Sequence, residues 1–485
     1  MTDWSAAPRL AGPEVPPPER PRLLLLSFHF PPGQSVGGLR WQMLAHLAAE
    51  QGWGLDVVTV HPSSLDAPDQ ARLSALPPDT RVFGVPLRTH WMERLENAAA
   101  RAARSVRGTR RPAPPPDPGD PAPAPRAPRG GGSYARDEVR WRLSRPRDWL
   151  RAYFALRTNL ADLDWGLAAA TLARPLVQPG LHRAIISCGP PHMVHEAARR
   201  LAGRTGLPLV VDMRDPWSLV NRLPEDLASP VVYWMAGRFE PRAVREAMLV
   251  VTNTAAARRE LQARYPAAAE RILTVMNGYD EDPMPAPRPG PRFVLAYAGT
   301  IYLDRDPRPL FQAAARVIRE SGLLPADFGI ELIGNVDNYG GVPVSTIAQE
   351  EGISAFVTTG PPRPRQAAME FLAGATMLVS LPQDSHLAIP SKIYEYLRFE
   401  AWVLALAEPG SATAEALDQS GVDVVAPDDV DGMARVLAGR VRAFRAGSRP
   451  GRPTGVAHLS RRAQAEPLFQ LLADRLGLPR PASPV

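Results

Sequence analysis

The 485-residue sequence contains little cysteine, little lysine and no long apolar run. Its single cysteine, Cys188, excludes an intrachain disulfide framework and any metal site that needs several cysteines, and it suits a reducing compartment. No apolar run approaches the roughly 20 residues that cross a bilayer. The first residues also lack the apolar core of a signal peptide. We therefore expect a soluble, cytoplasmic protein that at most contacts the inner face of the membrane.

The chain is mildly basic, with a formal charge of +6. This charge is compatible with a face toward anionic lipid or an anionic substrate, and also with a general preference for arginine. The basic segment Tyr134–Arg157, with spaced Trp, Leu and Phe, is compatible with ordinary surface helices or with a segment at a lipid interface. We find no recognition-helix signature and no strands with interleaved aromatic and basic residues, so we expect no nucleic-acid partner.

Short apolar runs typical of buried parallel strands alternate with helical patterns along most of the chain. This alternation and the length predict an α/β protein with two Rossmann-like, doubly wound parallel-sheet domains that face a cleft. The predicted parts are a disordered tail (1–20), an N-terminal domain (21–284) with a Pro-rich insert at about 105–133, a C-terminal domain (285–456), and a helix that returns to the first domain plus a tail (457–485).

Lys392 is the only lysine of the sequence and lies in the stretch IPSKIYEYLRFEAWVLA, where Pro390 suits the first turn of a helix. A helix N-terminus attracts anions, and an ammonium group adds a compact charge that arginine does not freely replace. Glu395 follows three residues later on the same helix face, where it can accept hydrogen bonds from two ribose hydroxyls. The pair indicates a nucleoside diphosphate, and a plain surface ion pair is the alternative.

Gly299 and Thr300 directly follow an apolar strand in the stretch YAGTIY. Glycine lets a phosphate approach the backbone, whose N–H groups can donate to it together with the threonine hydroxyl. Arg305 lies a few residues later, where it could reach a diphosphate. The alternatives are a strand-ending turn and a solvated arginine.

The first half of the chain carries a second glycine loop, PPGQSVGGLR, between a strand and a helix. Gly37 and Gly38 allow close approach by a ligand, and Arg40 lies at the start of the helix. The loop lacks the GxGxxG spacing, so it does not predict NAD binding.

Two more loops, SCGPPH and DMRDPW, follow neighbouring predicted strands of the first half. His192 could share a proton with a hydroxyl nucleophile, and Trp217 could stack on a sugar ring. Arg214 and Asp215 could fix sugar hydroxyls. The alternatives are a capping or core histidine and a structural ion pair between Asp212 and Arg214.

Together these stretches resemble the glycosyltransferases of family 4, which have the GT-B fold. The resemblance covers most of residues 21–476 outside the Pro-rich insert and rests on FPPGQSVGGLRWQMLAHLAAEQGWGLDVVTV, SCGPP, VDMRDPW, MNGYD, AGTIY and PSKIYEYL. It implies that the C-terminal domain binds a nucleotide-sugar donor and that the N-terminal domain binds the acceptor. The residues that match the family's donor-binding positions and its N-terminal glycine loop are Gly299, Thr300, Lys392, Glu395, Gly37 and Gly38.

The resemblance also implies retention of anomeric configuration, an oxocarbenium-like transition state, and no metal ion or cofactor. One position departs from the family pattern. The family commonly carries a glutamate eight residues before Glu395, where this sequence has Leu387. Asp384 and His386 are candidates to replace its contact with the sugar.

We therefore expect a glycosyltransferase that moves a sugar from a nucleoside diphosphate to a saccharide, lipid-linked or small-molecule acceptor. Biosynthesis of a polysaccharide, a glycolipid or a secondary metabolite would use such a reaction. The candidate catalytic residues are Lys392, Asp215 and His192. A UDP-sugar epimerase of the same fold is one alternative, although it would need more acid–base side chains than the sequence offers. The absent glutamate motivates another alternative, a non-catalytic saccharide-binding scaffold.

Overall fold

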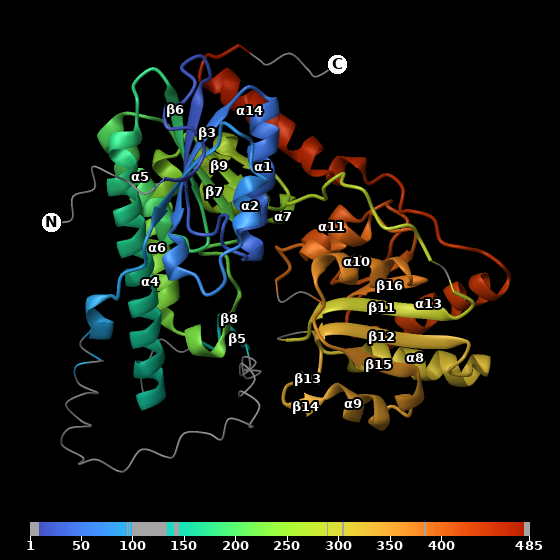
Figure 1. Ribbon diagram of the computed structural model, residues 1–485. Coiled ribbons are helices and arrows are strands. Elements are labelled where there is room, and N and C mark those ends of the chain that lie inside the picture. The colour runs from blue at the N-terminus through green and yellow to red at the C-terminus, as the bar shows by residue number, and fades with distance from the viewer. Residues whose placement is uncertain are drawn as a thin grey trace, which may run out of the picture. The chain divides into compact units, whose positions relative to one another are not determined.

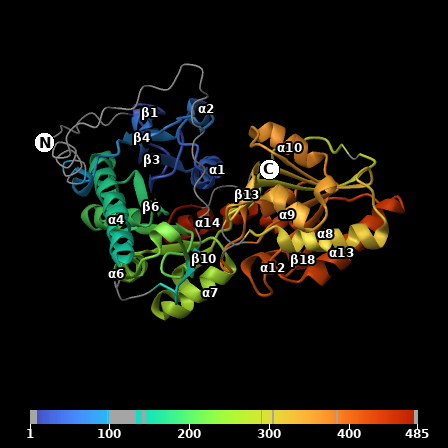
Figure 2. The same ribbon diagram turned by 90° about the horizontal axis from the view of Figure 1, so that it is seen from below.

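The computed structural model describes residues 9–94, 96, 98, 133–139, 145–288, 290–302, 305–382 and 385–479. The chain divides into two compact units, which comprise Met1–Ser218 with Glu225–Val250, and Leu219–Pro224 with Val251–Val485. Two large sheets, one of eight and one of six strands, organise the α/β fold (Figures 1 and 2). No helix within the described ranges is long and apolar enough to cross a bilayer.

The eight-stranded sheet has the order β1-β4-β3-β2-β6-β7-β9-β10, and its central strands pair in parallel. Helix α1 lies on one face and helices α4, α5 and α6 lie on the other (Figure 1). The strands are β1 (Arg9–Ala11), β2 (Arg22–Ser27), β3 (Gly54–Val60), β4 (Arg81–Val85), β6 (His182–Cys188), β7 (Leu209–Arg214), β9 (Leu249–Thr252) and β10 (Ile272–Thr274). Further elements are β5 (Ser133–Ala135), β8 (Arg222–Pro224), α1 (Leu39–Glu50), α2 (Gln70–Ser74), α4 (Pro146–Ala173), α5 (Met193–Thr205), α6 (Pro230–Glu246) and α7 (Ala255–Arg264).

The six-stranded sheet is parallel throughout, in the order β15-β12-β11-β16-β17-β18. Its strands are β11 (Phe293–Thr300), β12 (Phe328–Asn335), β15 (Val357–Gly360), β16 (Met377–Ser380), β17 (Trp402–Leu406) and β18 (Asp423–Val425), and a short hairpin joins β13 (Asn338–Tyr339) to β14 (Val342–Pro343). The helices are α8 (Arg308–Ser321), α9 (Val344–Glu350), α10 (Arg365–Ala373), α11 (Ser391–Tyr396), α12 (Ala412–Ala416), α13 (Val430–Arg445) and α14 (Arg461–Arg475).

Alternation along β11 explains why helices cover both faces of this second sheet. Leu295 and Tyr297 belong to the apolar core that includes residues of α8 and α13, whereas Ala296 belongs to the core that includes residues of α10 and α11. Successive side chains of a strand point to opposite faces, so one apolar run supplies two cores. The polar residues that follow the run are therefore left at the carboxyl edge of the sheet.

A buried ionic network lies near the amino-terminal ends of neighbouring strands in the eight-stranded sheet. Asp56 accepts hydrogen bonds from Arg22 at 2.6 Å, from Arg81 and from His182 at 3.1 Å. Burial alone would raise the pKa of Asp56, but the bonds from His182 and Arg81 and the charge of Arg22 hold it well below its ordinary value. These buried charges therefore pair with one another across neighbouring strands of the sheet.

The structure corrects one part of the predicted tail. Residues Arg9–Ala11 form β1, which pairs antiparallel with β4, so the predicted disorder does not extend to them. The pairing gives their backbone groups partners that a three-residue pattern could not reveal. The predicted insert lies almost entirely outside the described residues. Helix α14 is attached through Gln464, which accepts from the Met276 backbone at 2.9 Å; its predicted return to the first domain stays a prediction.

Candidate nucleotide site

Near the carboxyl ends of β11 and β12, a pair of neighbouring glycines leaves one position without side chains. Gly299 pairs with Gly334 in register, and Thr300 pairs with Asn335 at the next position. Gly334 has φ of +118°, and a Cβ there would lie 2.0 Å from the Gly299 carbonyl oxygen, so only glycine fits. The two glycines leave open backbone at the edge where ligands of parallel sheets collect.

Lys392, in the first turn of α11, lies directly over Gly299. A Cβ on Gly299 would lie 2.2 Å from both Cε and Nζ of Lys392, and Nζ is 5.5 Å from the centre of the Tyr297 ring. Within the described part of the chain the ammonium group has no hydrogen-bond or ion-pair partner, and none joins it to Glu395. Burial and then the charge of Arg305 lower the pKa of Lys392 to about 8.

Arg305 adds a second positive charge to this edge. Its guanidinium donates to the Thr300 carbonyl oxygen at 3.1 Å and lies 4.4 Å from the centre of the Tyr302 ring. The Tyr297 hydroxyl donates to the same carbonyl oxygen at 2.9 Å, which fixes the turn after β11. Two cations held close together at an open backbone edge favour a multiply charged anion as ligand.

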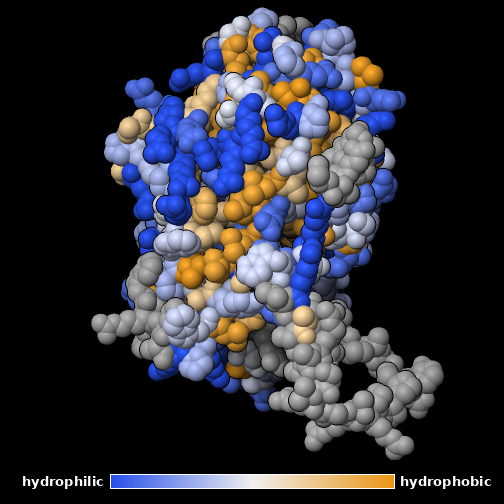
Figure 3. Space-filling model, turned by 90° about the vertical axis from the view of Figure 1, so that its left-hand side faces the viewer, coloured by the Kyte–Doolittle hydropathy of each residue, from blue (hydrophilic) through white to orange (hydrophobic). Residues whose placement is uncertain are grey.

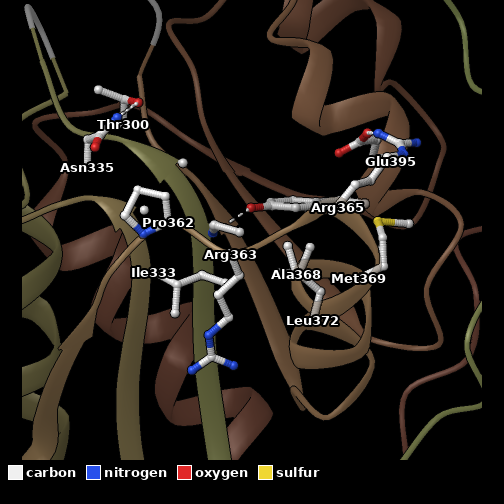
Figure 4. A pocket seen from close by; sticks show the side chains of 14 residues that line it. Thr300, Ile333, Asn335, Pro362, Arg363, Arg365, Ala368, Met369, Leu372 and Glu395 are labelled. Carbon is white, nitrogen blue, oxygen red and sulfur yellow. Dashed lines mark hydrogen bonds and ion pairs between the residues drawn. The ribbon is translucent and has the colours of Figure 1, made fainter. Parts of the chain in front are cut away.

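A pocket of about 280 Å³ adjoins the two glycines (Figure 4). Apolar side chains of β12, the loop after β15 and helix α10 form part of its lining, and polar side chains lie along its rim (Figure 4). The apolar lining residues are Ala298, Ile333, Pro362, Ala368, Met369 and Leu372, and the polar ones are Thr300, Asn335, Arg363, Arg365, Glu395 and Tyr396. An apolar slot with a few convergent polar groups is typical of a site for a flat, polar-edged ligand such as a nucleobase.

Glu395 lies at this pocket, and Arg365 holds its carboxylate. Arg365 Nη1 donates to Glu395 Oε1 at 2.6 Å, and the Glu395 side chain is 34% exposed. The interaction restrains one carboxylate oxygen in a charge-assisted hydrogen bond. Sequence reasoning missed Arg365 because it lies 30 residues before Glu395, at the start of α10, and no local spacing links the two.

In the first unit, the candidate Arg40 is committed to an internal contact. Its Nε donates to Asp212 Oδ2 at 2.8 Å, and Trp41 Nε1 donates to the same oxygen at 2.8 Å. Arg40 is 3% exposed. The ion pair fastens the start of α1 to the end of β7, and a ligand contact by Arg40 stays a prediction.

Arg214 and Gly37 meet at the ends of β7 and of the glycine loop. A Cβ on Gly37 would lie 2.1 Å from Arg214 Nη1, so the guanidinium occupies the space that glycine leaves. Arg214 has φ of +53°, a conformation rare outside glycine and often found at functional sites. Its Nη2 contacts Asp215 Oδ2 at 3.3 Å, whereas Nη1 is buried without a hydrogen-bond partner among the described residues.

His192 belongs to a chain of buried polar groups. Its ring stacks on Trp217 with centroids 5.2 Å apart, and its Nδ1 lies 3.4 Å from His195 Nε2. His195 Nδ1 in turn lies 2.8 Å from Ser187 Oγ. Burial lowers the pKa of His192 well below its ordinary value and that of His195 to about 4, so both rings are neutral at pH 7. A catalytic role of His192 stays a prediction, and sequence reasoning missed Ser187 and His195.

The position of the absent family glutamate is apolar in three dimensions as well. Leu387 is 1% exposed and packs in a cluster with Ile389 and Ile393. His386 Nε2 lies 2.9 Å from Glu260 Oε1, and Asp384 lies outside the described residues. In the part of the chain that the structure describes, no group of three or more His, Cys, Asp or Glu side chains could hold a metal ion.

Solved structures share this architecture along nearly the whole chain. A glycosyltransferase from Rickettsia africae superposes with a TM-score of 0.55 at 9% identity and covers 94% of this chain and 99% of its own. The UDP-forming α,α-trehalose-phosphate synthase of Burkholderia xenovorans gives 0.52 at 12% identity, covering 93% and 99%. The chain has the GT-B fold. At these identities the likeness shows the fold alone. No protein-family model and no curated protein sequence matches the chain.

Proposed function

We propose that this GT-B protein is a glycosyltransferase that uses a nucleoside diphosphate sugar as donor. The observation that carries the proposal is the ammonium group of Lys392, which lies over Gly299 with no ion-pair partner among the described residues, beside an apolar pocket of about 280 Å³. A half-buried cation with no direct ion pair among the described residues is partly desolvated in the free protein, and a bound diphosphate would supply a counter-charge. The GT-B fold adds to this argument, since the Rickettsia and Burkholderia proteins with that fold are named as a glycosyltransferase and a UDP-forming synthase.

Each part of the donor has a matching part of the second unit. The base would lie in the apolar slot between Ile333 and Leu372, and the ribose hydroxyls would donate to Glu395, whose Oε1 also accepts from Arg365. The diphosphate would bind the backbone at Gly299, with Lys392 and Arg305 neutralising its charge. We propose UDP as the nucleotide, because a pyrimidine is the smaller base and the pocket must also hold the ribose.

The same groups would act on the reaction itself. Negative charge grows on the β-phosphate as the glycosidic bond breaks, and fixed cations stabilise such charge in the transition state. No metal ion is needed for this step if Lys392 and Arg305 neutralise the leaving diphosphate. Retention of configuration belongs to the proposal, as does biosynthesis of a polysaccharide, glycolipid or secondary metabolite.

In this proposal the first unit binds the acceptor. Arg214 Nη1, which lacks a hydrogen-bond partner among the described residues, would donate to an acceptor oxygen, with Asp215 and Trp217 beside it. His192 is neutral at pH 7 and would act as a hydrogen-bond partner rather than as a charge. A cytoplasmic location stays a prediction from the cysteine content.

A thermal-shift panel of UDP-, GDP- and dTDP-sugars tests the proposal. We expect UDP-sugars to raise Tm most, since a ligand at about 100 times its Kd adds about 2.7 kcal/mol to the free energy of unfolding. A protein that no nucleotide stabilises would contradict the proposal and favour a scaffold. Epimerised UDP-sugar formed without acceptor would contradict it in favour of an epimerase.

The affinity for UDP is expected to fall as the pH rises through about 8. Lys392 must be protonated to pair with the diphosphate, and its pKa of about 8 means that the free protein loses this proton early. Binding raises that pKa, so complex formation takes up a proton above pH 8, and affinity falls up to about tenfold per pH unit. Calorimetric titration in two buffers of different ionisation enthalpy measures this uptake. A constant affinity up to about pH 9.5 would contradict the assignment of Lys392.

A further inference from the structure

The first turns of α4 extend beyond the part of the helix that packs on the protein. The helix has 28 residues, and its first buried side chain is that of Ala152. Before and just after that point lie three exposed apolar side chains, Trp149 (61% exposed), Leu150 (54%) and Phe154 (36%). We name residues Arg145–Phe154 the α4 tip. The lower end of α4 is visible in Figure 1, and Figure 3 shows the left-hand side of that view, where apolar patches lie among polar ones.

The α4 tip is also positively charged. Arg145 and Arg147 are exposed, and no acidic side chain of the described residues pairs with either. Arg151 is the exception, because it donates to Glu225 at 2.8 Å, and the Asp148 carboxylate accepts from the Arg145 backbone. Helices that lie in a membrane interface typically carry exposed tryptophan and leucine next to arginines that are free of ion pairs. The described residues of the α4 tip have this composition.

We propose that the α4 tip docks on the surface of a bilayer that contains anionic lipid. Trp149, Leu150 and Phe154 would enter the region between headgroups and acyl chains, while Arg145 and Arg147 pair with lipid phosphates. Charge complementarity favours this occupant over a second copy of the chain, which would bring like charges together at the tip. The inference does not depend on the transferase activity, because the tip lies outside the nucleotide site.

Sedimentation of the full chain with vesicles tests the docking. We expect binding to vesicles of phosphatidylglycerol and phosphatidylcholine, and little binding to phosphatidylcholine alone. Trp149→Ser with Leu150→Ser should weaken binding at least tenfold, whereas Leu324→Ser, which changes a leucine of the second unit that is at least as exposed, should not change it. Arg145→Gln with Arg147→Gln should weaken binding about 30-fold and flatten its salt dependence, compared with the exposed pair Arg204→Gln and Arg319→Gln.

Circular dichroism melting establishes that each variant is folded. Failure of the wild type to sediment with anionic vesicles would overturn the proposal, as would equal binding by the tip variants. A dimer in analytical ultracentrifugation that Trp149→Ser and Leu150→Ser dissociate would assign the tip to self-association instead. If another segment of this chain covers the tip, the wild type would also fail to bind the vesicles, and that result would overturn the proposal.

Discussion

Lys392→Met is expected to lower kcat/KM for sugar transfer by about 10²- to 10³-fold, which corresponds to about 2.7–4 kcal/mol of transition-state stabilisation. Methionine retains much of the length and apolar body of lysine but removes the charge that lies over Gly299. Because Nζ has no hydrogen-bond or ion-pair partner among the described residues, its removal breaks no such internal contact, and the fold should stay intact. Steady-state kinetics together with thermal melting separate these two effects.

Two comparisons sharpen this test. Lys392→Arg should recover little activity, because the space over Gly299 fits a narrow ammonium group and arginine's planar fork is wider. Arg319→Gln removes an exposed positive charge on α8, outside the pocket lining, and should be neutral. Full activity of folded Lys392→Met would mean that Lys392 does not act on the diphosphate.

Gly299→Ala is expected to reduce activity about as much as Lys392→Met. The new methyl group would lie 2.2 Å from Lys392 Cε and Nζ, so the flexible lysine must move away from the strand end. The double variant should then be no worse than either single variant, because both changes remove the same interaction. Kinetics of the three variants give the coupling energy.

Gly360→Ala is a matched control for the glycine substitution. Gly360 also ends a strand of the second sheet, but a Cβ there would lie 3.5 Å from an Ile333 methyl, which is ordinary van der Waals contact. We expect near-normal activity from it. Additive losses in the Gly299→Ala and Lys392→Met pair would contradict a shared contact.

The central strands of both sheets, and the residues that we propose for the nucleotide site, could be identified from local sequence. The run RLLLLS is buried at every position of β2, because a central parallel strand is covered on both faces. The glycines after an apolar run lie at the carboxyl end of β11 for the same topological reason. Lys392 was informative since it stands alone among arginines, and the structure places it against Gly299.

The partners of these residues could not be predicted, since they come from distant segments. Arg365 reaches Glu395 from another helix, and Trp217 stacks on His192 from the loop after β7. Arg40 likewise pairs with Asp212, which lies 172 positions later in the sequence. Contacts of this kind follow from tertiary packing rather than from local propensity. A sequence pattern can therefore predict candidate residues, but it does not predict which residues they contact.

Calorimetric titration of the wild type and of Lys392→Met with UDP and with uridine tests the nucleotide site most directly. Uridine lacks the diphosphate, so both proteins should bind it with the same affinity. We predict that Lys392→Met binds UDP at least tenfold more weakly than the wild type does, because the lost ion pair acts only on the phosphates. Equal affinity of the two proteins for UDP would contradict the account.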